Sequence, residues 1–135
     1  MIDNTHENLL ANYDWSFPVP IAYGPGRLRE MGEHAKNFEL TKPLIVTDQG
    51  SAGLPFIDTL QQALLSAGIG SEVFAEVAPN PRDSDIVLAR NAYLEGGHDS
   101  VIAIGGGSGM DAGKSTALTA HNQCDIWQFD FDRDV

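Results

Sequence analysis

A run of glycines in the last third of the chain has the composition of a phosphate-binding loop. Gly105-Gly106-Gly107-Ser108-Gly109 directly follows the apolar run Ser100–Ile104. Glycines have no Cβ atom, so a ligand can approach their backbone closely. Where such a loop leads into a helix, the N–H groups and the helix dipole favour an anion, and the Ser108 hydroxyl adds a donor. The loop therefore predicts phosphate binding, and a tight turn without a ligand is the alternative.

Two general nucleotide-binding motifs match this loop only in part. Gly107, Gly109 and Ala112 satisfy the dinucleotide pattern G-x-G-x-x-A, although that pattern normally follows the first strand of its unit. Gly113-Lys114-Ser115 resembles the end of a P-loop, but the first glycine that a P-loop requires falls on Ser108. A P-loop-like nucleotide-binding module is therefore the weaker alternative.

The elements that must position this loop alternate along the chain. The predicted strands, each a short apolar or alternating run, are Pro20–Tyr23, Pro43–Thr47, Glu72–Val77 and Ser100–Ile104. The predicted helices, with apolar residues three or four apart, lie around Leu28–Ala35, Ile57–Leu64, Ile86–Tyr93 and Met110–Leu118. Of the strands, Ser100–Ile104 is the most typical of a buried strand. The alternation predicts an α/β, Rossmann-like fold with a mainly parallel sheet flanked by helices.

The composition limits the classes of partner. The chain has 135 residues, enough for one domain, and 8 basic against 19 acidic residues give a net charge of −11. Such a charge repels nucleic-acid backbones, so we expect no nucleic-acid partner. No apolar stretch approaches the roughly 18 to 20 residues of a membrane span, and no membrane partner is expected. The single cysteine, Cys124, cannot form an internal disulfide, so the expected location is cytoplasmic.

The last eleven residues carry three aromatic side chains, at Trp127, Phe129 and Phe131, with no later element to pack over them. We therefore expect the chain to be an N-terminal fragment of a longer protein; an ordinary exposed tail is the alternative. The first dozen residues and the aspartate-rich end are expected to be disordered.

Four features in order resemble one enzyme family. Ile104–Lys114 closely resembles the GGGSxxDxxK signature of the iron-containing (group III) alcohol dehydrogenases. Tyr23-Gly24-Pro25-Gly26 resembles their FGxG turn, Val46-Thr47-Asp48 their VTD strand end, and Pro79-Asn80-Pro81 their xNP segment. The resemblance extends from about residue 21 to about residue 118, and agreement of four ordered features is more specific than any one of them.

The resemblance implies a fold and a cofactor. Residues 1–135 would form the dehydroquinate synthase-like N-terminal domain that binds NAD, and the helical metal-binding domain of the family would be absent from the chain. The residues implied in cofactor binding are Asp48, Asn80, Gly105, Gly106, Gly107, Ser108 and Asp111.

The roles implied for these residues differ. Gly106, Gly107 and Ser108 would contact the pyrophosphate. Asp48 would lie near the adenosine ribose, where a carboxylate accepts a hydrogen bond from the 2′-hydroxyl and repels a 2′-phosphate, favouring NAD over NADP; a turn or helix-cap aspartate is the alternative. Asn80 would approach the nicotinamide side, and a turn asparagine between two prolines is the alternative there.

Two charged residues at the start of the last predicted helix leave alternatives open. Asp111 is expected in the first turn of that helix, where a carboxylate serves equally well as a cap or dipole partner. Lys114 would support the same helix or a neighbouring carboxylate.

The family's metal site has no counterpart here. Its members bind iron or zinc through one aspartate and three histidines that follow the nucleotide domain. His6, His34, His98 and His121 are scattered without the spacing of metal ligands, and we expect surface positions for all four. We predict no metal ligand and no catalytic residue in this chain, so the fragment alone would be inactive.

The resemblance thus implies an NAD-dependent, metal-containing alcohol dehydrogenase that transfers a hydride between an alcohol or aldehyde substrate and NAD. A homodimer or larger assembly would use the segment around residues 17–23. A glycerol dehydrogenase or dehydroquinate synthase-like relative, and a stand-alone module that senses NAD, are the further alternatives.

Overall fold

A parallel three-stranded sheet forms the centre of the molecule. The computed structural model describes residues 11–16, 18–122 and 124–130. Strands β3 (Pro43–Asp48), β4 (Glu72–Val77) and β5 (Ser100–Ala103) lie in the order β4-β3-β5. In this register, Ile45 of β3 pairs with Val73 of β4 and with Ile102 of β5. The predicted α/β, Rossmann-like fold with a parallel sheet is confirmed.

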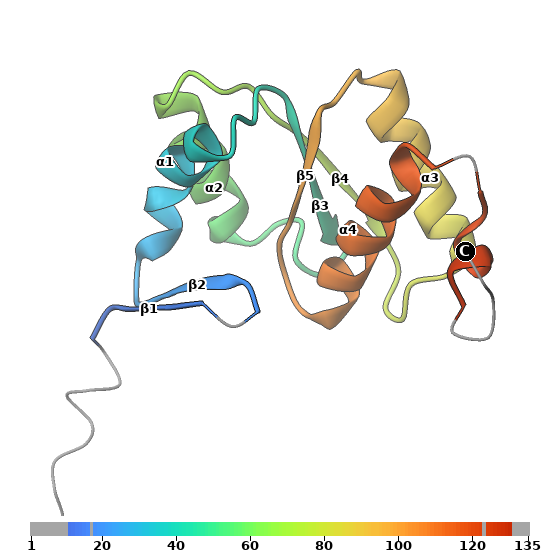
Figure 1. Ribbon diagram of the computed structural model, residues 1–135, viewed down its shortest axis with the longest axis horizontal. Helices are drawn as coiled ribbons and strands as arrows, with labels where there is room; N and C mark the ends of the chain where they lie inside the picture. Colours follow the sequence, from blue (N-terminus) through green and yellow to red (C-terminus); the bar gives the residue numbers. More distant parts are fainter. Residues whose placement is uncertain (1–10, 17, 123, 131–135) are drawn as a thin grey trace, which may run out of the picture.

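Helices cover both faces of this sheet (Figure 1). The turn η2 (Arg27–Glu30) with the helices α1 (Met31–Asn37) and α2 (Pro55–Ser66) lies on one face, and α3 (Asp83–Glu95) with α4 (Gly107–Ala120) lies on the other. Side chains along β3 alternate between two cores, as the two-residue period of a strand requires. Leu44 and Val46 pack with residues of α3 and α4, whereas Ile45 packs with residues of α1 and α2.

The edge position of β5 corrects one prediction. Within the described residues β5 pairs only with β3, and only Ile102 of its four residues is buried. The most buried strand is instead β3, in which all of residues 43–47 are buried, because a central strand has a neighbour on each side. The apolar composition of residues 100–104 does not reveal which place in the sheet the strand takes.

The start of α4 corrects a second prediction. The helix begins at Gly107 and ends at Ala120, not near Met110 and Leu118. Its first helical hydrogen bond runs from Met110 N to Gly106 O at 3.0 Å. Glycine is a poor helix former, so the sequence pattern placed the start too late; close packing of this helix on the sheet outweighs that preference.

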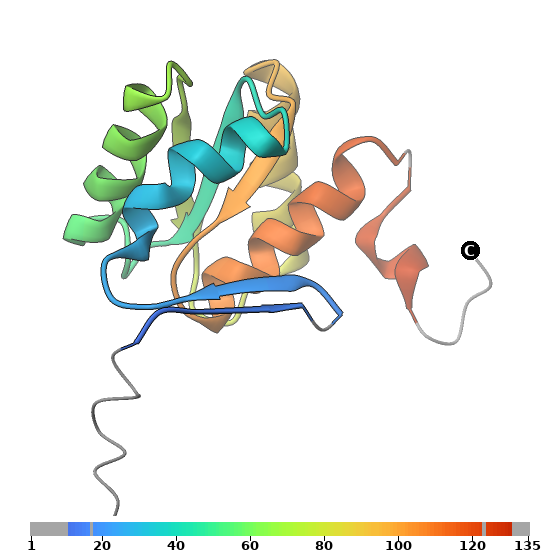
Figure 2. The ribbon, with the colours of Figure 1, turned by 60° about the vertical axis from the view of Figure 1, so that its left-hand side comes forward.

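A β-hairpin stands apart from the sheet. β2 (Pro20–Tyr23), predicted as a strand, pairs in antiparallel register with β1 (Tyr13–Ser16), which the sequence pattern did not indicate. The hairpin lies at one edge of the molecule, outside the layered body (Figure 2). The Arg27 guanidinium joins it to η2: Nη1 donates to the Tyr13 and Tyr23 carbonyls and to Asp14, and the Nε and Nη2 groups donate to Glu30.

The segment after α4 packs more than expected. A short 3-10 turn, η3 (Ile126–Phe129), lies beside α3, and the Trp127 indole Nε1 donates to Asp83 Oδ2 at 3.2 Å. Ile126 and Phe129 are half-buried, so the expectation of unpacked aromatic residues is wrong for Phe129. Phe131 and the first ten residues lie outside the described residues. No helix in the described part has the length and apolar character that crossing a membrane requires.

Candidate functional site

Three loops meet at one edge of the sheet. The strands are parallel, so their carboxyl ends lie at the same edge, where α/β proteins bind ligands. β3 ends at Asp48, β4 leads into Asn80, and β5 leads into the glycine loop. Two contacts join these loops: the Asn80 backbone N–H donates to Ser108 Oγ at 3.2 Å, and Asp48 Oδ2 lies against Gly105.

The outer side of the glycine loop is open. Gly106 and Gly107 are exposed, and a Cβ atom on either would meet nothing within 4 Å. The N–H groups of Gly107, Ser108 and Gly109 precede the first helical hydrogen bond, and no side chain caps them. Unpaired N–H groups at the positive end of a helix dipole suit an anion. The open outer side and the N–H donors of this loop suit an anion such as a phosphate group.

The inner side of the loop is closed by oxygen atoms of β3 and the turn after it. A Cβ atom on Gly105 would lie 2.8 Å from Asp48 Oδ2, 3.2 Å from Ser51 Oγ and 3.3 Å from Thr47 Oγ1. Gly105 also has φ +127°, a conformation that residues with a Cβ rarely adopt. Both the space and the backbone conformation therefore require glycine at this position. Thr47 Oγ1 is buried and has no hydrogen-bond partner among the described residues.

Gly109 is a structural residue that the predicted site did not include. It is buried, and a Cβ atom there would lie 2.8 Å from the Ile104 carbonyl oxygen and 3.3 Å from Asp48 Oδ2. Its role is to let the first turn of α4 approach the ends of β3 and β5. The sequence did indicate a special role for Gly109, because it is the last glycine of the run Gly105–Gly109.

The Asp48 carboxylate is held by the turn that follows β3. Ser51 N donates to Oδ1 at 3.0 Å, and Ser51 Oγ donates to Oδ2 at 2.8 Å. The structure thus shows that Asp48 has the turn role that the sequence analysis gave as an alternative. The contact of Asp48 with a ribose stays a prediction. Each carboxylate oxygen can accept a further hydrogen bond. Ser51 was missed, although a serine three residues after an aspartate is a recognisable turn pattern.

Asn80 has a left-handed backbone conformation, with φ +56°. Asparagine tolerates this conformation better than most residues that carry a Cβ. Its side chain is exposed, and its backbone N–H is the group that reaches Ser108. The turn role of Asn80 is therefore present in the structure, and contact with a nicotinamide stays a prediction.

Asp111 is not in the first turn of α4, so that expectation is wrong. The helix begins at Gly107, three residues earlier than predicted, and its first turn contains no acidic residue. Asp111 is exposed and lines a groove between α3, α4 and η3, together with Pro81, Asp83 and Trp127. Neither the cap nor the dipole role applies, and a cofactor contact of Asp111 stays a prediction. Lys114 is exposed on the same helix.

The described histidines occupy three different environments. His98 is buried, which contradicts the expected surface position: its Nδ1 lies 3.0 Å from the Lys42 carbonyl oxygen and its Nε2 lies 3.5 Å from Glu72 Oε2. The cause is the turn after α3, which folds the ring against the start of the sheet. His121 is exposed, with Nε2 3.1 Å from the Tyr93 hydroxyl. His34 is half-buried, 3.8 Å from Glu30.

Metal ligands do not gather in the described part of the chain. No group of three or more His, Cys, Asp or Glu side chains there is arranged to hold a metal ion. His6 lies outside the described residues. The residues that the structure describes therefore do not fit a metal site.

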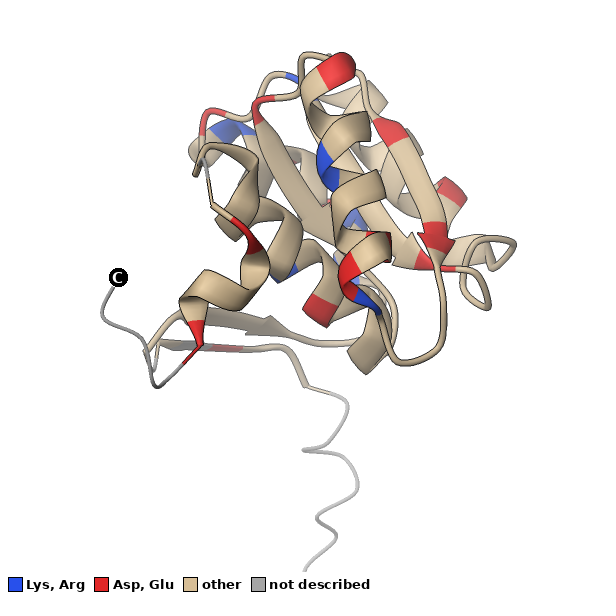
Figure 3. Cartoon of the chain, turned by 90° about the vertical axis from the view of Figure 1, so that its right-hand side faces the viewer, with Lys and Arg blue, Asp and Glu red and all other residues tan. Residues whose placement is uncertain are grey.

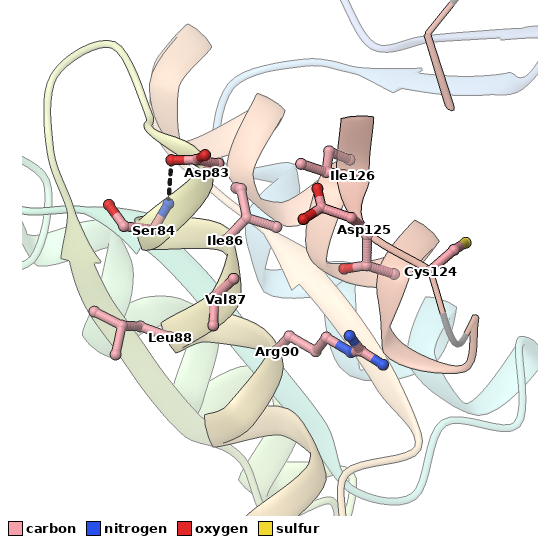
Figure 4. Close-up of a pocket in the computed structure, with 10 residues that line it drawn as sticks. Asp83, Ser84, Ile86, Val87, Leu88, Arg90, Cys124, Asp125 and Ile126 are labelled. Carbon is pink, nitrogen blue, oxygen red and sulfur yellow. Dashed lines mark hydrogen bonds between the residues drawn. The ribbon is translucent and has the colours of Figure 1, made fainter. Parts of the chain in front are cut away.

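A separate cavity of about 530 Å³ lies between α3, the end of α4 and residues 124–126 (Figure 4). Apolar side chains of α3, including Ile86 and Val87, line it together with Arg90 and Cys124. None of its lining residues is among the seven predicted cofactor-binding residues. The cavity and the glycine loop are therefore distinct features of the molecule.

Acidic residues dominate the charge of the molecule, with 19 against 8 basic residues. In the view of Figure 3 both kinds of charge are spread over several elements rather than gathered in one basic patch. An anion at the glycine loop would thus depend on backbone N–H groups and the helix dipole more than on lysine or arginine side chains.

Comparison with known proteins gives a consistent result. The family model for iron-containing alcohol dehydrogenases matches residues 18–134. Alcohol dehydrogenase 4 of Saccharomyces cerevisiae is 32% identical over 112 residues, which cover 82% of this chain and 29% of the yeast protein.

Two solved structures are also similar. NADH-dependent butanol dehydrogenase A from Thermotoga maritima superposes with a TM-score of 0.73 and 30% identity, over 78% of this chain and 27% of that one. Sulfoacetaldehyde reductase from Bifidobacterium kashiwanohense, solved in complex with NAD+, gives a TM-score of 0.73 and 25% identity, over 83% and 29%. The chain thus spans less than a third of the length of each of these three proteins.

Proposed function

The chain belongs to the iron-containing alcohol dehydrogenase family, and from this premise we propose that it is the NAD-binding domain of an oxidoreductase. The whole enzyme would transfer a hydride between an alcohol and NAD. The observation that carries the proposal is the glycine loop, whose outer side is open and whose N–H groups lie at the start of α4. That arrangement suits the negative charge of a pyrophosphate and leaves the outer side of the loop accessible to it.

The residues of this chain would bind and orient the cofactor. Backbone N–H groups of Gly106, Gly107 and Ser108 would donate to the pyrophosphate, and the α4 dipole would stabilise its charge. Asp48, at the end of β3, would accept a hydrogen bond from the adenosine ribose. Asn80, in the connection after β4, would border the nicotinamide side. When bound, NAD supplies the carbon that accepts or returns the hydride.

The names of the similar proteins support the class of reaction but not one substrate. One is named for its dependence on NADH and one was solved with NAD+. The names butanol dehydrogenase and sulfoacetaldehyde reductase refer to different compounds, so the proposal extends only to an alcohol or aldehyde. Iron or zinc would be held by residues beyond those described here, and we derive no step through the metal.

Titration of the purified protein with NADH and with ATP–Mg tests the proposed function. A dehydrogenase domain should bind NADH more tightly, because the loop departs from a P-loop at Ser108 and Gly113 is packed against β5. Dissociation constants from NADH fluorescence and from calorimetry give the comparison. Tighter binding of ATP–Mg would contradict the dehydrogenase proposal and favour a P-loop-like module.

Replacement of Asp48 by glycine should relax discrimination against NADP. The carboxylate would repel a 2′-phosphate, so its removal should strengthen NADPH binding relative to NADH by roughly tenfold, since each 1.4 kcal/mol changes a binding constant tenfold. The ratio of the two dissociation constants measures the effect. Ser51→Ala is the matched control, because it removes a hydrogen bond to the carboxylate but keeps its charge. An unaltered ratio in Asp48→Gly would show that Asp48 serves only the turn.

We also propose a homodimer or larger assembly that uses the β1–β2 hairpin, and a cytoplasmic location. The apolar side chains of Val19 and Ile21 are 60% and 43% exposed on the hairpin, and covering them would stabilise an assembly. Phe17 lies outside the described residues. Sedimentation velocity at micromolar concentration tests the assembly, and a monomer would argue against it. The cytoplasmic proposal is supported by the presence of a single cysteine.

A further inference from the structure

We propose that Asn80 is a positioning residue that acts through its backbone: its left-handed conformation aims its N–H at Ser108 Oγ and so directs the proton of the Ser108 hydroxyl away from the connection between β4 and α3. This inference deepens the proposed function and rests on it for the identity of the ligand. It adds a backbone contact with the glycine loop to the place that Asn80 is expected to take near the nicotinamide.

The connection between β4 and α3 has few backbone donors. Proline has no N–H group, so within Pro79-Asn80-Pro81 only Asn80 has a backbone donor. That donor lies 3.2 Å from Ser108 Oγ, and residues 80 and 108 are 28 positions apart in the chain. The bond therefore ties the connection between β4 and α3 to the glycine loop that follows β5.

The chemistry of a hydroxyl group gives this bond a directional effect. A serine hydroxyl has one donor hydrogen and two acceptor lone pairs. The Asn80 N–H occupies one lone pair, so the hydroxyl hydrogen must point elsewhere. Among the described residues, the structure gives Ser108 Oγ no other hydrogen-bond partner. The hydrogen is thus available to an acceptor outside the described residues, such as a ligand bound at the glycine loop.

The conformation of Asn80 explains the residue type without a role for its side chain. The side chain is exposed, and no hydrogen bond joins it to another described residue. With φ +56°, the backbone lies where asparagine and glycine are tolerated and other residues are disfavoured. Glycine at this position should therefore preserve the donor direction, and alanine should not.

Dissociation constants for NADH in four variants test the inference. We expect Asn80→Gly to bind within about twofold of the wild type, and Asn80→Ala about fivefold more weakly, the factor that a left-handed alanine would cost. Ser108→Ala should weaken binding about tenfold through loss of a donor to a charged group. The double variant Asn80→Ala/Ser108→Ala should bind no more weakly than Ser108→Ala alone, because both changes remove the same effect.

Two results would overturn the inference. If Asn80→Gly weakens binding as much as Asn80→Ala, the side chain makes the contact. If the double variant shows the product of the two single losses, strain at residue 80 acts independently of Ser108. Thermal unfolding of each variant separates these outcomes from loss of the fold.

A measurement without a ligand keeps this inference separate from the proposed function. In the wild-type protein without a nucleotide, the Asn80 amide should exchange with solvent more slowly than in Ser108→Ala, because the hydroxyl accepts its hydrogen. Equal exchange rates would refute the contact itself. Slower exchange in a protein that fails to bind NADH would instead refute the proposed function and leave the contact standing.

Discussion

A valine at position 107 is expected to abolish detectable NADH binding while the free energy of unfolding changes by less than about 1 kcal/mol. A Cβ atom on Gly107 meets no atom within 4 Å, so the fold has room for a side chain. That room lies on the open side of the loop, where the pyrophosphate would bind. Loss of two hydrogen bonds to a charged group, at about 1.5–3 kcal/mol each, would weaken binding at least a hundredfold.

Fluorescence titration and urea unfolding of the same Gly107→Val preparation check both parts of this prediction. Gly53→Val is the matched control, because Gly53 is also exposed and a Cβ atom there also meets nothing within 4 Å. The control should keep both the affinity and the stability of the wild type. An unchanged dissociation constant in Gly107→Val would remove the glycine loop from the cofactor site.

Replacement of Gly113 by valine is expected to destabilise the fold itself, with a loss of about 3 kcal/mol in the free energy of unfolding, at the upper end of what overpacking a core costs. Gly113 is buried in α4, and a Cβ atom there would lie 2.3 Å from Ala103 Cβ and 3.1 Å from Ala103 Cα. Ala103 belongs to β5, so the clash cannot be relieved by rotating a side chain. Helix α4, whose first residues belong to the candidate site, would have to move away from the sheet.

Urea unfolding at equilibrium measures this loss, and Lys114→Val provides the control within the same helix. Lys114 is exposed, so valine there costs only the lower helix preference of a β-branched residue, less than about 1 kcal/mol. A similar loss of stability in both variants would mean that the close contact between α4 and β5 does not limit the fold.

Local patterns in the sequence predicted most of the secondary structure. Ile57, Leu60 and Leu64 repeat at helical spacing because they cover one face of the sheet, and all three are buried. The order of the strands was not predictable in this way, because pairing joins residues far apart in the chain. β5 was therefore predicted to be the most buried strand, although it lies at the edge of the sheet. β1 was missed because its main contacts are with β2 rather than with the sheet.

The sequence predicted which residues lie at the candidate site, because these residues follow the ends of predicted strands. Asp48, Asn80 and the glycine loop each follow a predicted strand, and parallel strands bring their carboxyl ends together. The contacts between these loops were not predictable, since the bond from Asn80 N to Ser108 Oγ joins a backbone group to a distant side chain. The prediction that Asp111 lies in the first turn of α4 was wrong, because it depended on where the helix starts. Tertiary packing determines that start.

The central claim is that the glycine loop at the start of α4 binds the pyrophosphate of NAD. Titration of NAD+ into the 15N-labelled protein, followed by amide chemical shifts, tests it most directly, because millimolar concentrations reveal even weak binding at single residues. We predict the largest shifts at the amides of Gly106, Gly107 and Ser108, with a smaller shift at Asn80. Shifts confined to the cavity beside α3, or none at the glycine loop, would contradict the claim.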